Sequence, residues 1–404
     1  MTALGPLHGL RIIELGHFVA APFAGRLLAD LGAEVIKVEP PSSGDPARQW
    51  GAMAGNRSIW WSVHARNKKS VTVDVKTSPG RDLILDLIRD ADALIENYRP
   101  GQLERWGLGP DVLKATNPDC VVVRISGFGQ DGPYRDKPAF GVIGEALGGI
   151  RYLTGYPKTQ LDLPPVRVGI SLGDSVAGLY AVIGVLAGVL ARRHGSAPAS
   201  PVDIAIYEAV FSLLEGALPE FSLLGIVRQP AGSAIPTVAP SNSYQTSDGE
   251  WICIAGNSDR IFQRLSTLIG RPEMARDPRF STNDGRVAHM AKLDAMIAEW
   301  VAGCSASEAA TLLEAADVPA CRIYTIADCA NDAHFIARGM IRQVDDPALG
   351  LTLHPGVVPR FAEWVDAPMK AGPELGANTE EVLTDILNYT PERIADLRHR
   401  GIVT

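Results

Sequence analysis

The sequence predicts an α/β protein with a doubly wound, Rossmann-like large domain and a smaller α+β domain. Two observations predict this class. Between residues 10 and 129, short apolar runs typical of buried strands alternate with helical patterns, as in repeated βαβ units. A stretch rich in Pro, Ser and Gly at 228–249 then leads into a segment with a hairpin signal and several helices. The 404 residues are enough for more than one hydrophobic core.

The first βαβ unit consists of a buried strand at 10–16, a helix at 20–31 and a second strand at 34–39. Small residues in the helix allow it to pack closely on the strands. The turn at 16–19 reads GHFV and lacks the GxGxxG pattern. The unit therefore does not carry the fingerprint of a dinucleotide site.

The alternation continues with strands at 66–76, 93–98 and 120–129 and with helices at 79–90 and 110–116. Ligands of open α/β sheets bind beyond the carboxyl ends of the strands, so polar residues that follow each strand are candidates for a binding site. His17, Asn97 and Gln130 occupy such positions. Six basic residues near these ends would suit a phosphorylated ligand: Arg48, Lys68, Lys69, Lys76, Arg105 and Lys137.

A long apolar helix follows Asp174 and extends to residue 191. Asp174 comes directly after Gly173, where we expect the N-cap of this helix, and an aspartate there is stabilised by free N–H groups and by the helix dipole. A second interpretation makes the same carboxylate a nucleophile. The helix is short for a membrane span and contains Gly178 and Gly184, so we expect it to be buried in the protein.

The later part of the chain predicts the small domain and two closing helices. A hairpin is expected at 244–255, turning at Asp248-Gly249. Helices are expected at 258–269, 291–303 and 306–316, and strand and loop patterns return at 320–365. Two capped helices, starting near Thr379 and Thr390, end the sequence.

Composition excludes some functions. A net charge of −8 argues against nucleic acid as a partner, because phosphate binding needs a basic surface. The start of the sequence has no basic stretch followed by an apolar one, so we expect no signal peptide, no membrane partner and a cytoplasmic location.

Cysteine usage agrees with that location. The cysteines are odd in number, scattered and without a CxxC pair, which is typical of reduced thiols and not of a disulfide framework or a zinc site. They are Cys120, Cys253, Cys304, Cys321 and Cys329. Cys120 and Cys253 lie in strand-like apolar runs and are expected in the core.

Seven stretches, taken together and in order, resemble the class III CoA-transferases, the family of formyl-CoA transferase and carnitine CoA-transferase. They are LHGLRIIELGHFVAAPFAGRLLADLGAEVIKVEPPSSGD at 7–45, NKKSVTVDVKT at 67–77, ENYRPGQLERWGLG at 96–109, SGFGQDGPYRDKPAF at 126–140, GDSVAGLYAVIGVLA at 173–187, DPRFSTNDGRV at 277–287 and PELGANTEEVL at 373–383. The resemblance implies a large CoA-binding domain built from residues 1–225 and 321–404, with a small domain inserted at 226–320. It also implies an interlocked homodimer.

The resemblance makes Asp174 the nucleophile and makes CoA or acyl-CoA a substrate, with no permanently bound cofactor and no metal. Carried over motif by motif, the CoA contacts fall on His17, Phe18, Val19, Val73, Asp74, Val75, Lys76, Asn97, Tyr98, Arg105, Lys137, Pro138, Ala139 and Phe140. Pro40 stands where formyl-CoA transferases use an arginine against CoA, so Arg48 is the candidate substitute.

The mechanism implied is a covalent one. Asp174 would attack the thioester to give a mixed anhydride and then an aspartyl-CoA thioester, and the acceptor acid would reverse these steps. Backbone N–H groups at 16–18 and in the loop IPTVAPSNS at 235–243 are candidate donors to the oxyanion.

Two departures bear on the substrate. Val19 replaces a glutamine of the formyl enzymes, and the 235–243 loop replaces their glycine-rich loop, which disfavours formyl and oxalyl groups. The sequence looks most like relatives acting on dicarboxylic acids, so we expect a donor such as succinyl-CoA, with Arg48 or Arg167 binding its distal carboxylate.

Two other functions remain open. An α-methylacyl-CoA racemase would use the same fold, but it needs a histidine base, and this sequence has Phe140 at the corresponding position. A CoA-binding protein without catalytic activity is the other alternative.

Overall fold

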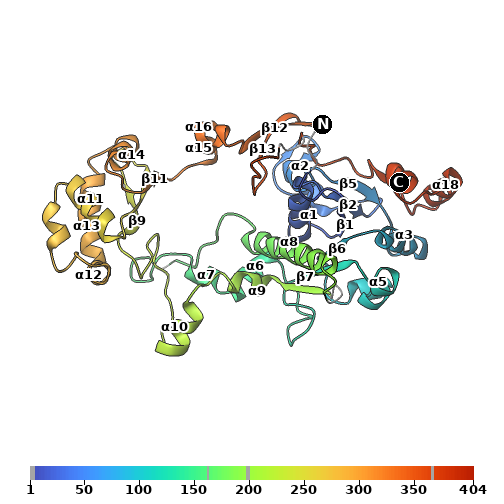
Figure 1. Ribbon diagram of the computed structural model, residues 1–404, viewed down its shortest axis with the longest axis horizontal. Helices are drawn as coiled ribbons and strands as arrows, with labels where there is room; N and C mark the ends of the chain where they lie inside the picture. Colours follow the sequence, from blue (N-terminus) through green and yellow to red (C-terminus); the bar gives the residue numbers. More distant parts are fainter. Residues whose placement is uncertain (1–4, 162, 197–200, 365–367) are drawn as a thin grey trace. The chain divides into compact units, whose positions relative to one another are not determined.

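The computed structural model of the protein describes residues 5–161, 163–196, 201–364 and 368–404. The chain forms two compact units (Figure 1). The first comprises Met1–Arg151, Val168–Leu224 and Ala337–Thr404, and the second comprises Tyr152–Arg167 and Gly225–Ile336. The second unit is therefore an insertion into the first. The sequence prediction set the limits of the small domain at 226 and 320.

A six-stranded parallel sheet forms the centre of the first unit. Its strands are β1 (Arg11–Leu15), β2 (Glu34–Glu39), β5 (Lys69–Thr72), β6 (Ala93–Glu96), β7 (Val121–Ser126) and β8 (Val202–Ala205). They lie in the order β5-β2-β1-β6-β7-β8, and every neighbouring pair is parallel. The order reverses between β1 and β6, where Leu15 is paired with Glu96. This arrangement confirms the prediction of a doubly wound sheet.

Helices cover both faces of this sheet. One face carries α1 (Ala20–Asp30), α8 (Leu172–Arg193) and α9 (Ile206–Phe211). The other face carries α3 (Ser78–Arg89), α4 (Gln102–Arg105), α5 (Pro110–Thr116), the π-helical turn η3 (Val382–Ile386) and α18 (Pro391–His399). The core on this other face therefore joins side chains from the beginning of the chain, such as Ile36, with side chains from its end, such as Leu383 and Leu397.

Only one side of α8 is buried. Val176, Ala181 and Val185 pack in the core, and a side chain at Gly178 would come within 2.9 Å of the Ala20 carbonyl oxygen of α1. The opposite side exposes Leu179, Ile183 and Leu190 to solvent. The prediction of a buried helix holds for one side only, because the apolar pattern runs around the whole helix while the sheet covers one side.

In the described part of the chain, α8 is also the one helix that is long and apolar enough to cross a membrane. A core helix of a soluble protein satisfies the same criteria of length and composition. The buried side of α8 packs against the sheet and against α1.

The second unit is an antiparallel sheet with helices on one face. The strands β9 (Ser241–Gln245), β10 (Trp251–Ala255) and β11 (Ala320–Arg322) lie in the order β11-β10-β9. Ile252 and Ile254 face the core, where helices such as α11 (Asp259–Leu268), α13 (Met290–Val301) and α14 (Ala306–Ala315) supply the other side chains. Gly249 closes the β9–β10 turn with φ of +82°, which confirms the predicted hairpin.

The remaining elements connect these layers. In the first unit they are η1 (Pro46–Gln49), β3 (Met53–Ala54), β4 (Arg57–Ser58), α2 (Ile59–His64), α6 (Gly141–Leu147), α10 (Ala217–Leu224), β12 (Ile341–Asp346), β13 (Gly350–Pro355) and α17 (Thr379–Glu381). In the second they are η2 (Pro272–Arg276), α12 (Asn283–Ala288) and α15 (Ile326–Asn331). Two short helices, α7 (Ile150–Leu153) and α16 (Ala333–Ala337), cross the boundary between the units.

Buried polar contacts attach the β12–β13 hairpin to α2. The Ser62 hydroxyl donates to Asp346 at 2.6 Å and lies 3.3 Å from Nε2 of His354. Arg57 also forms an ion pair with Asp346, at 3.1 Å. All of these side chains are buried, so the hairpin is held by a small set of polar groups that water does not reach.

Candidate active site

The site is centred where the strand order reverses, at the carboxyl ends of β1 and β6. His17 follows β1 and Asn97 follows β6. Oδ1 of Asn97 accepts the N–H of His17 at 2.8 Å, and Nδ2 of Asn97 donates to the carbonyl of His17 at 2.9 Å. One carboxamide therefore satisfies both backbone polar groups of His17 and joins the two strand ends.

The next residue, Phe18, is held in a left-handed conformation. Its φ is +61°, which is uncommon for a bulky side chain and costs free energy of the order of 1 kcal/mol. The N–H of Phe18 donates to Oδ1 of Asp45 at 3.1 Å, and the same oxygen accepts the N–H of Ala47 at 2.8 Å. Asp45 thus fixes the turn between β1 and α1 from the side.

These bonds correct one prediction. The N–H groups of His17 and Phe18 were candidate donors to an oxyanion, but they donate to Asn97 and Asp45 instead. A donor that already has a buried partner cannot turn to an oxyanion without breaking that bond. The role of these two groups is to fix the backbone of the turn.

Buried charges lie directly beneath this turn. Nζ of Lys37 donates to the Gly16 carbonyl at 2.8 Å and contacts Asp45 at 2.8 Å and Glu14 at 2.9 Å. The other oxygen of Glu14 accepts from Lys68 at 2.6 Å. Burial alone would lower the pKa of Lys37, but the carboxylates of Asp45 and Glu14 raise it, so Lys37 is charged. The turn is therefore anchored to an ammonium group that is shielded from water.

The pKa values of Glu14 and Lys68 follow from the same balance between burial and the opposite charges nearby. Burial would raise the pKa of Glu14, but the two lysines hold it below its ordinary value. Burial lowers the pKa of Lys68 to about 8 against the opposing effect of Glu14.

Aromatic rings surround the turn. The His17 ring lies edge-on to Tyr98 with centroids 4.5 Å apart, and Phe18 packs on Trp50 at 4.5 Å and near Phe140 at 6.4 Å. Burial lowers the pKa of His17, so its imidazole is neutral at neutral pH. Trp50 is 47% exposed. The rings therefore present an apolar, partly open surface beside the strand ends.

Asp174 lies in the first turn of α8 but is not its N-cap. Ser171 holds that position, and Asp174 is the third helical residue. The expected cap was therefore assigned three residues too late, because Leu172 and Gly173 are already helical. At this position the free N–H groups and the dipole of α8 favour an ionised carboxylate.

The Asp174 carboxylate lies against the backbone of α6. A β-carbon at Gly141 would overlap Oδ2 of Asp174, so only glycine leaves room for the carboxylate there. Gly141 directly follows Phe140, whose ring is near Phe18. The structure thus joins the candidate nucleophile to the 137–140 segment and, through Phe140, to the turn after β1.

Glu145 is a nearby residue that the sequence did not single out. It is 2% exposed, and its Oε1 accepts the N–H of Gly173 at 3.3 Å. It therefore positions the first turn of α8 from α6. A single acid within the glycine-rich apolar stretch GVIGEALGG was the available signal.

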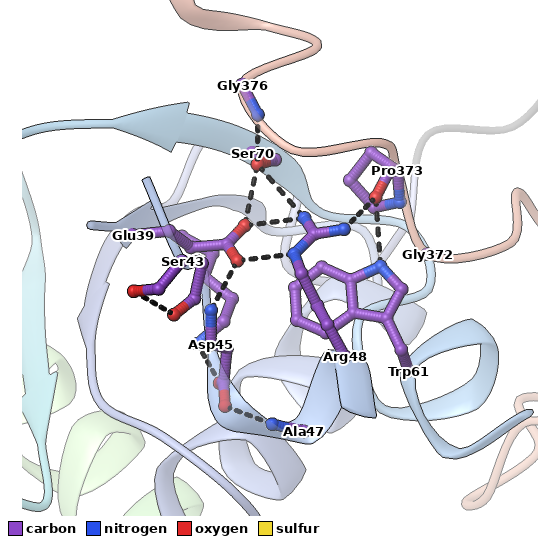
Figure 2. A network of polar contacts seen from close by, with 12 residues as sticks. Glu39, Ser43, Asp45, Ala47, Arg48, Trp61, Ser70, Gly372, Pro373 and Gly376 are labelled. Atoms are coloured by element: carbon purple, nitrogen blue, oxygen red, sulfur yellow. Dashed lines mark hydrogen bonds and ion pairs between the residues drawn. The ribbon is translucent and has the colours of Figure 1, made fainter. Parts of the chain in front are cut away.

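Arg48 is enclosed by protein groups (Figure 2). It donates to both carboxylate oxygens of Glu39 at 2.8 Å and to the Pro373 carbonyl at 3.2 Å, and it stacks on Trp61 at 3.7 Å. Its charge is neutralised by Glu39. Arg48 therefore ties η1 to the C-terminal segment, which leaves little of its guanidinium for a substrate.

The predicted basic cluster divides into two groups. Lys68 is buried on Glu14, and Lys69 pairs with Glu34 and Glu381, so these cations are already neutralised. The exposed members are Lys76 after β5, Arg105 after β6 and Lys137 after β7. The exposed positive charge is thus spread along the carboxyl edge of the sheet.

The other predicted contact residues lie at the same edge. Val73, Asp74 and Val75 follow β5, with Val73 buried and the other two half-buried. Pro138 and Ala139 belong to the loop after β7, and a β-carbon at Gly127 would overlap that of Ala139. Val19 is buried at the start of α1, where it is the N-cap residue.

The remaining candidates fall in the second unit. Arg167 is exposed and belongs to the Tyr152–Arg167 segment, and the 235–243 loop belongs to the same unit. In the described ranges, no group of three or more His, Cys, Asp and Glu side chains is arranged to hold a metal ion.

Comparison with protein families matches this chain to one model. The model of CoA-transferase family III covers residues 7–379. A succinyl-CoA–D-citramalate CoA-transferase of Chloroflexus aurantiacus is 48% identical over 399 residues, which are 98% of each chain. The beta subunit of a succinyl-CoA–L-malate CoA-transferase of the same bacterium is 39% identical over 406 residues, covering 100% of this chain and 99% of the subunit.

Solved structures agree with these relatives. A CAIB/BAIF family protein from Brucella suis superposes with a TM-score of 0.81 at 33% identity, covering 95% of this chain and 100% of that chain. The Rv3272 protein of Mycobacterium tuberculosis superposes with a TM-score of 0.80 at 30% identity, covering 94% of this chain and 99% of that one.

Proposed function

The chain belongs to CoA-transferase family III, and from this premise we propose that it transfers CoA from succinyl-CoA or a similar dicarboxyl-CoA to a short dicarboxylic acid. The donor is supported by the relatives, whose names give succinyl-CoA as the donor and citramalate or malate as the acceptor. The proposed acceptor is a small dicarboxylic acid with a hydroxyl group, the class to which both acceptors belong.

The observation that carries the mechanism is the Asp174 carboxylate in the first turn of α8, packed on Gly141. In the proposed reaction, an Asp174 oxygen attacks the thioester carbonyl, and the C–S bond breaks to leave a mixed anhydride and CoA thiolate. The thiolate attacks the aspartyl carbonyl, which releases succinate and leaves an aspartyl-CoA thioester. The acceptor carboxylate then attacks this thioester, and its C–S bond breaks to give a second mixed anhydride and CoA thiolate. The thiolate attacks the acceptor carbonyl of that anhydride, which forms the new acyl-CoA and releases the Asp174 carboxylate.

The same position explains how the carboxylate serves both as nucleophile and as leaving group. The helix dipole stabilises the anion, which favours the carboxylate both when it attacks as an anion and when it leaves from the anhydride. Because the thioester bond energy is retained through each step, the reaction needs no other energy source.

We place CoA along the carboxyl edge of the sheet. Lys76, Arg105 and Lys137 supply exposed positive charge at three strand ends for the phosphates of CoA. The rings of Phe18, Trp50 and Phe140 offer an apolar surface between that edge and Asp174. Arg48 is neutralised by Glu39, so we do not propose it for the distal carboxylate of the acyl group.

We also propose a homodimer, interlocked as in the family. Large apolar side chains are exposed on adjacent helices of the first unit, on α8 and from α9 to α10. Tyr180 of α8 is hydrogen-bonded at 2.8 Å to Ser212 at the end of α9, so the two surfaces are continuous. A second copy is the partner that such a surface fits.

The nucleophile is tested by trapping. Wild-type protein incubated with succinyl-CoA and then with hydroxylamine is expected to carry a hydroxamate at Asp174, detected by peptide mass spectrometry. Asp174→Ala is expected to lose at least ~100-fold of kcat, the scale of a covalent nucleophile. Asp111→Ala is the matched control, since Asp111 is an exposed aspartate in the first turn of another helix, α5. An Asp174→Ala enzyme that retains most of its rate would refute the mechanism.

Substrate choice is tested separately, with a panel of acyl-CoA donors and acid acceptors read out by mass spectrometry. Transfer from succinyl-CoA to citramalate or malate is expected, with ping-pong kinetics. Transfer confined to monocarboxylic acyl groups would refute the dicarboxylate assignment while leaving the nucleophile intact. Incorporation of solvent deuterium at the α-carbon without an acceptor would instead indicate racemase chemistry.

A further inference from the structure

Two cysteines that lie far apart in the sequence are direct neighbours in the second unit. Cys253 lies on β10 and Cys321 on β11, and the antiparallel register pairs these two residues with each other. Directly opposed residues point to the same face of a sheet, so the two thiols are side by side.

The hydrogen bonds of the ladder define the spacing of this pair. Ile323 donates to the Trp251 carbonyl and Ala255 donates to the Pro319 carbonyl, both at 2.9 Å. These bonds alternate along the ladder, which makes Cys253 and Cys321 a hydrogen-bonded pair, with α-carbons about 5.5 Å apart. Disulfides span α-carbon separations of about 4.4–6.8 Å, so this pair can be joined without displacing the strands.

Both thiols are accessible. Cys253 and Cys321 are exposed, whereas their neighbours Ile252 and Ile254 point to the opposite face and into the core. Ser243 stands opposite Cys253 on β9, with its Oγ 3.2 Å from the sulfur. Cys321 also lines a pocket of about 480 Å³. A small reagent can therefore reach the pair from solvent. The exposure also shows that the expectation of a core position for Cys253 was wrong.

We propose that Cys253 and Cys321 form a dithiol site that closes into an intramolecular disulfide when it meets a peroxide or a small disulfide. The two thiols lose two protons and two electrons as the S–S bond forms. Hydrogen peroxide is thereby reduced to two molecules of water, an alkyl hydroperoxide to one alcohol and one water, and a small disulfide to two thiols. Neither cysteine is among the residues assigned to acyl transfer, so the proposal does not depend on that function.

The bond would have a structural effect because of what lies between the cysteines. The chain from β10 to β11 contains α11, α12, α13 and α14, so the disulfide closes a loop that includes the helical layer of the unit. Closing a long loop restricts the unfolded chain and stabilises the folded one. The oxidised protein is therefore expected to melt at a higher temperature than the reduced protein.

The test uses the full-length protein and maps the bond. Protein is treated with hydrogen peroxide or oxidised glutathione, free thiols are blocked, and the sample is digested after Lys, Arg and Glu. Glu308, Glu314 and Arg322 then separate Cys304, Cys321 and Cys329 onto different peptides. The expected product is a cross-linked pair, WICIAGNSDR with AADVPACR, lighter by two hydrogen atoms than the two peptides together.

Matched serine variants give the controls. Cys253→Ser and Cys321→Ser are each expected to abolish the cross-link and the rise in melting temperature, whereas Cys304→Ser is expected to preserve both. Phenylarsine oxide, which bridges two adjacent thiols, provides a second probe without oxidation. We expect it to bind the wild type at least 10-fold more tightly than either single variant at the pair.

The proposal is refuted if oxidation leaves Cys253 and Cys321 separately blocked, or if the cross-link joins either of them to another cysteine. Equal binding of phenylarsine oxide to the wild type and to Cys321→Ser would refute the adjacency itself.

Discussion

Asn97 determines the conformation of the turn after β1 because its carboxamide occupies both backbone polar groups of His17. Asp45 holds the next residue, Phe18, by accepting its backbone N–H. These two side chains sit on different loops, so the turn is held from both sides of β1. A residue predicted to contact CoA is thus also a positioning residue for the site.

Asn97→Ala is expected to reduce kcat by roughly 30-fold, equivalent to about 2 kcal/mol for two lost hydrogen bonds. The turn then relaxes, and the residues beside Asp174 lose their fixed places. Steady-state kinetics with succinyl-CoA would measure the loss, and the rate of hydroxamate trapping at Asp174 would show that it lies in acyl transfer.

Asn117 offers a matched control. Asn117 precedes β7, and its carboxamide also binds backbone groups. It donates to the carbonyls of Ile88, Arg89 and Ala91, which lie before β6. Asn117→Ala should lower stability and leave kcat unchanged. Equal effects of the two variants on kcat would contradict a specific role for Asn97.

Gly141→Ala is expected to lower kcat by about 10-fold or more, because the new methyl group overlaps the Asp174 carboxylate and must displace it. KM for the acyl-CoA should change less, since Gly141 is not one of the residues proposed to bind the phosphates of CoA. Gly169→Ala is the control, because a β-carbon there meets nothing within 4 Å. Unchanged kinetics of Gly141→Ala would show that Asp174 does not react from this position.

At this scale the sequence predicted Asp174, His17 and Asn97 as site residues, because motifs carry residue identity. It could not assign their backbone roles. Whether an N–H of the turn is free depends on Asp45 and Asn97, which approach from other loops. The neutralisation of Arg48 likewise depends on Glu39 and on the distant Pro373 carbonyl.

At the scale of elements, the β12–β13 hairpin is attached through buried groups whose protonation can be followed. Ser62 donates its hydroxyl proton to Asp346, so the contact between Ser62 and His354 requires a proton on Nε2 of His354. Nδ1 of His354 is buried and has no hydrogen-bond partner among the described residues. The histidine is therefore held in its neutral form.

This arrangement predicts acid sensitivity. Burial, aided by Arg66, lowers the pKa of His354 from 6.5 to about 4. Between these values the unfolded chain binds a proton that the folded chain does not, so the free energy of unfolding falls as pH decreases from 6.5 toward 4. Above pH 6.5 this cost is absent.

Between pH 6.5 and 4, His354→Gln is expected to remove about 2 kcal/mol of the fall in the free energy of unfolding. Urea unfolding at a series of pH values would measure it. His399→Gln, which changes an exposed histidine of α18, should leave the decline as it is in the wild type. A pH profile of His354→Gln that matches the wild type would disprove the assignment.

Sequence patterns predicted which helices and strands exist better than they predicted which sides of those elements are buried. The hairpin at 244–255 was found from its Asp248-Gly249 turn. The helix that became α8 was also found, but its exposed side was not, because an apolar sequence does not show which neighbour covers it. The N-cap position was missed because the helix was expected to begin after Gly173, whereas Leu172 and Gly173 are already helical.

At the scale of the whole molecule, the exposed apolar side chains of α8 and α10 make the oligomeric state testable. Phe221 and Leu224 lie three residues apart on α10 and are 56% and 69% exposed. The double variant Phe221→Glu/Leu224→Glu should shift the mass measured by light scattering from two chains to one. Leu312→Glu, on α14 of the second unit, should leave a dimer. A wild-type protein with the mass of one chain would contradict the proposal.

The overall class was predictable because alternating strands and helices allow few topologies. The strand order β5-β2-β1-β6-β7-β8 follows from right-handed crossovers in a doubly wound sheet. The pairing of Cys253 with Cys321 was not predictable, since it depends on the register of two strands separated by four helices.

The core on one face of the sheet has a consequence for synthesis on the ribosome. Ile36 and Val71 of the first strands pack with Val382, Leu383 and Leu397, which are translated last. At roughly 10 residues per second, on the order of 30 s pass after β5 emerges before η3 and α18, which complete the cover of this face, exist. During that interval the nascent chain exposes part of an apolar sheet face, and a chaperone that binds such faces is expected to hold it until termination.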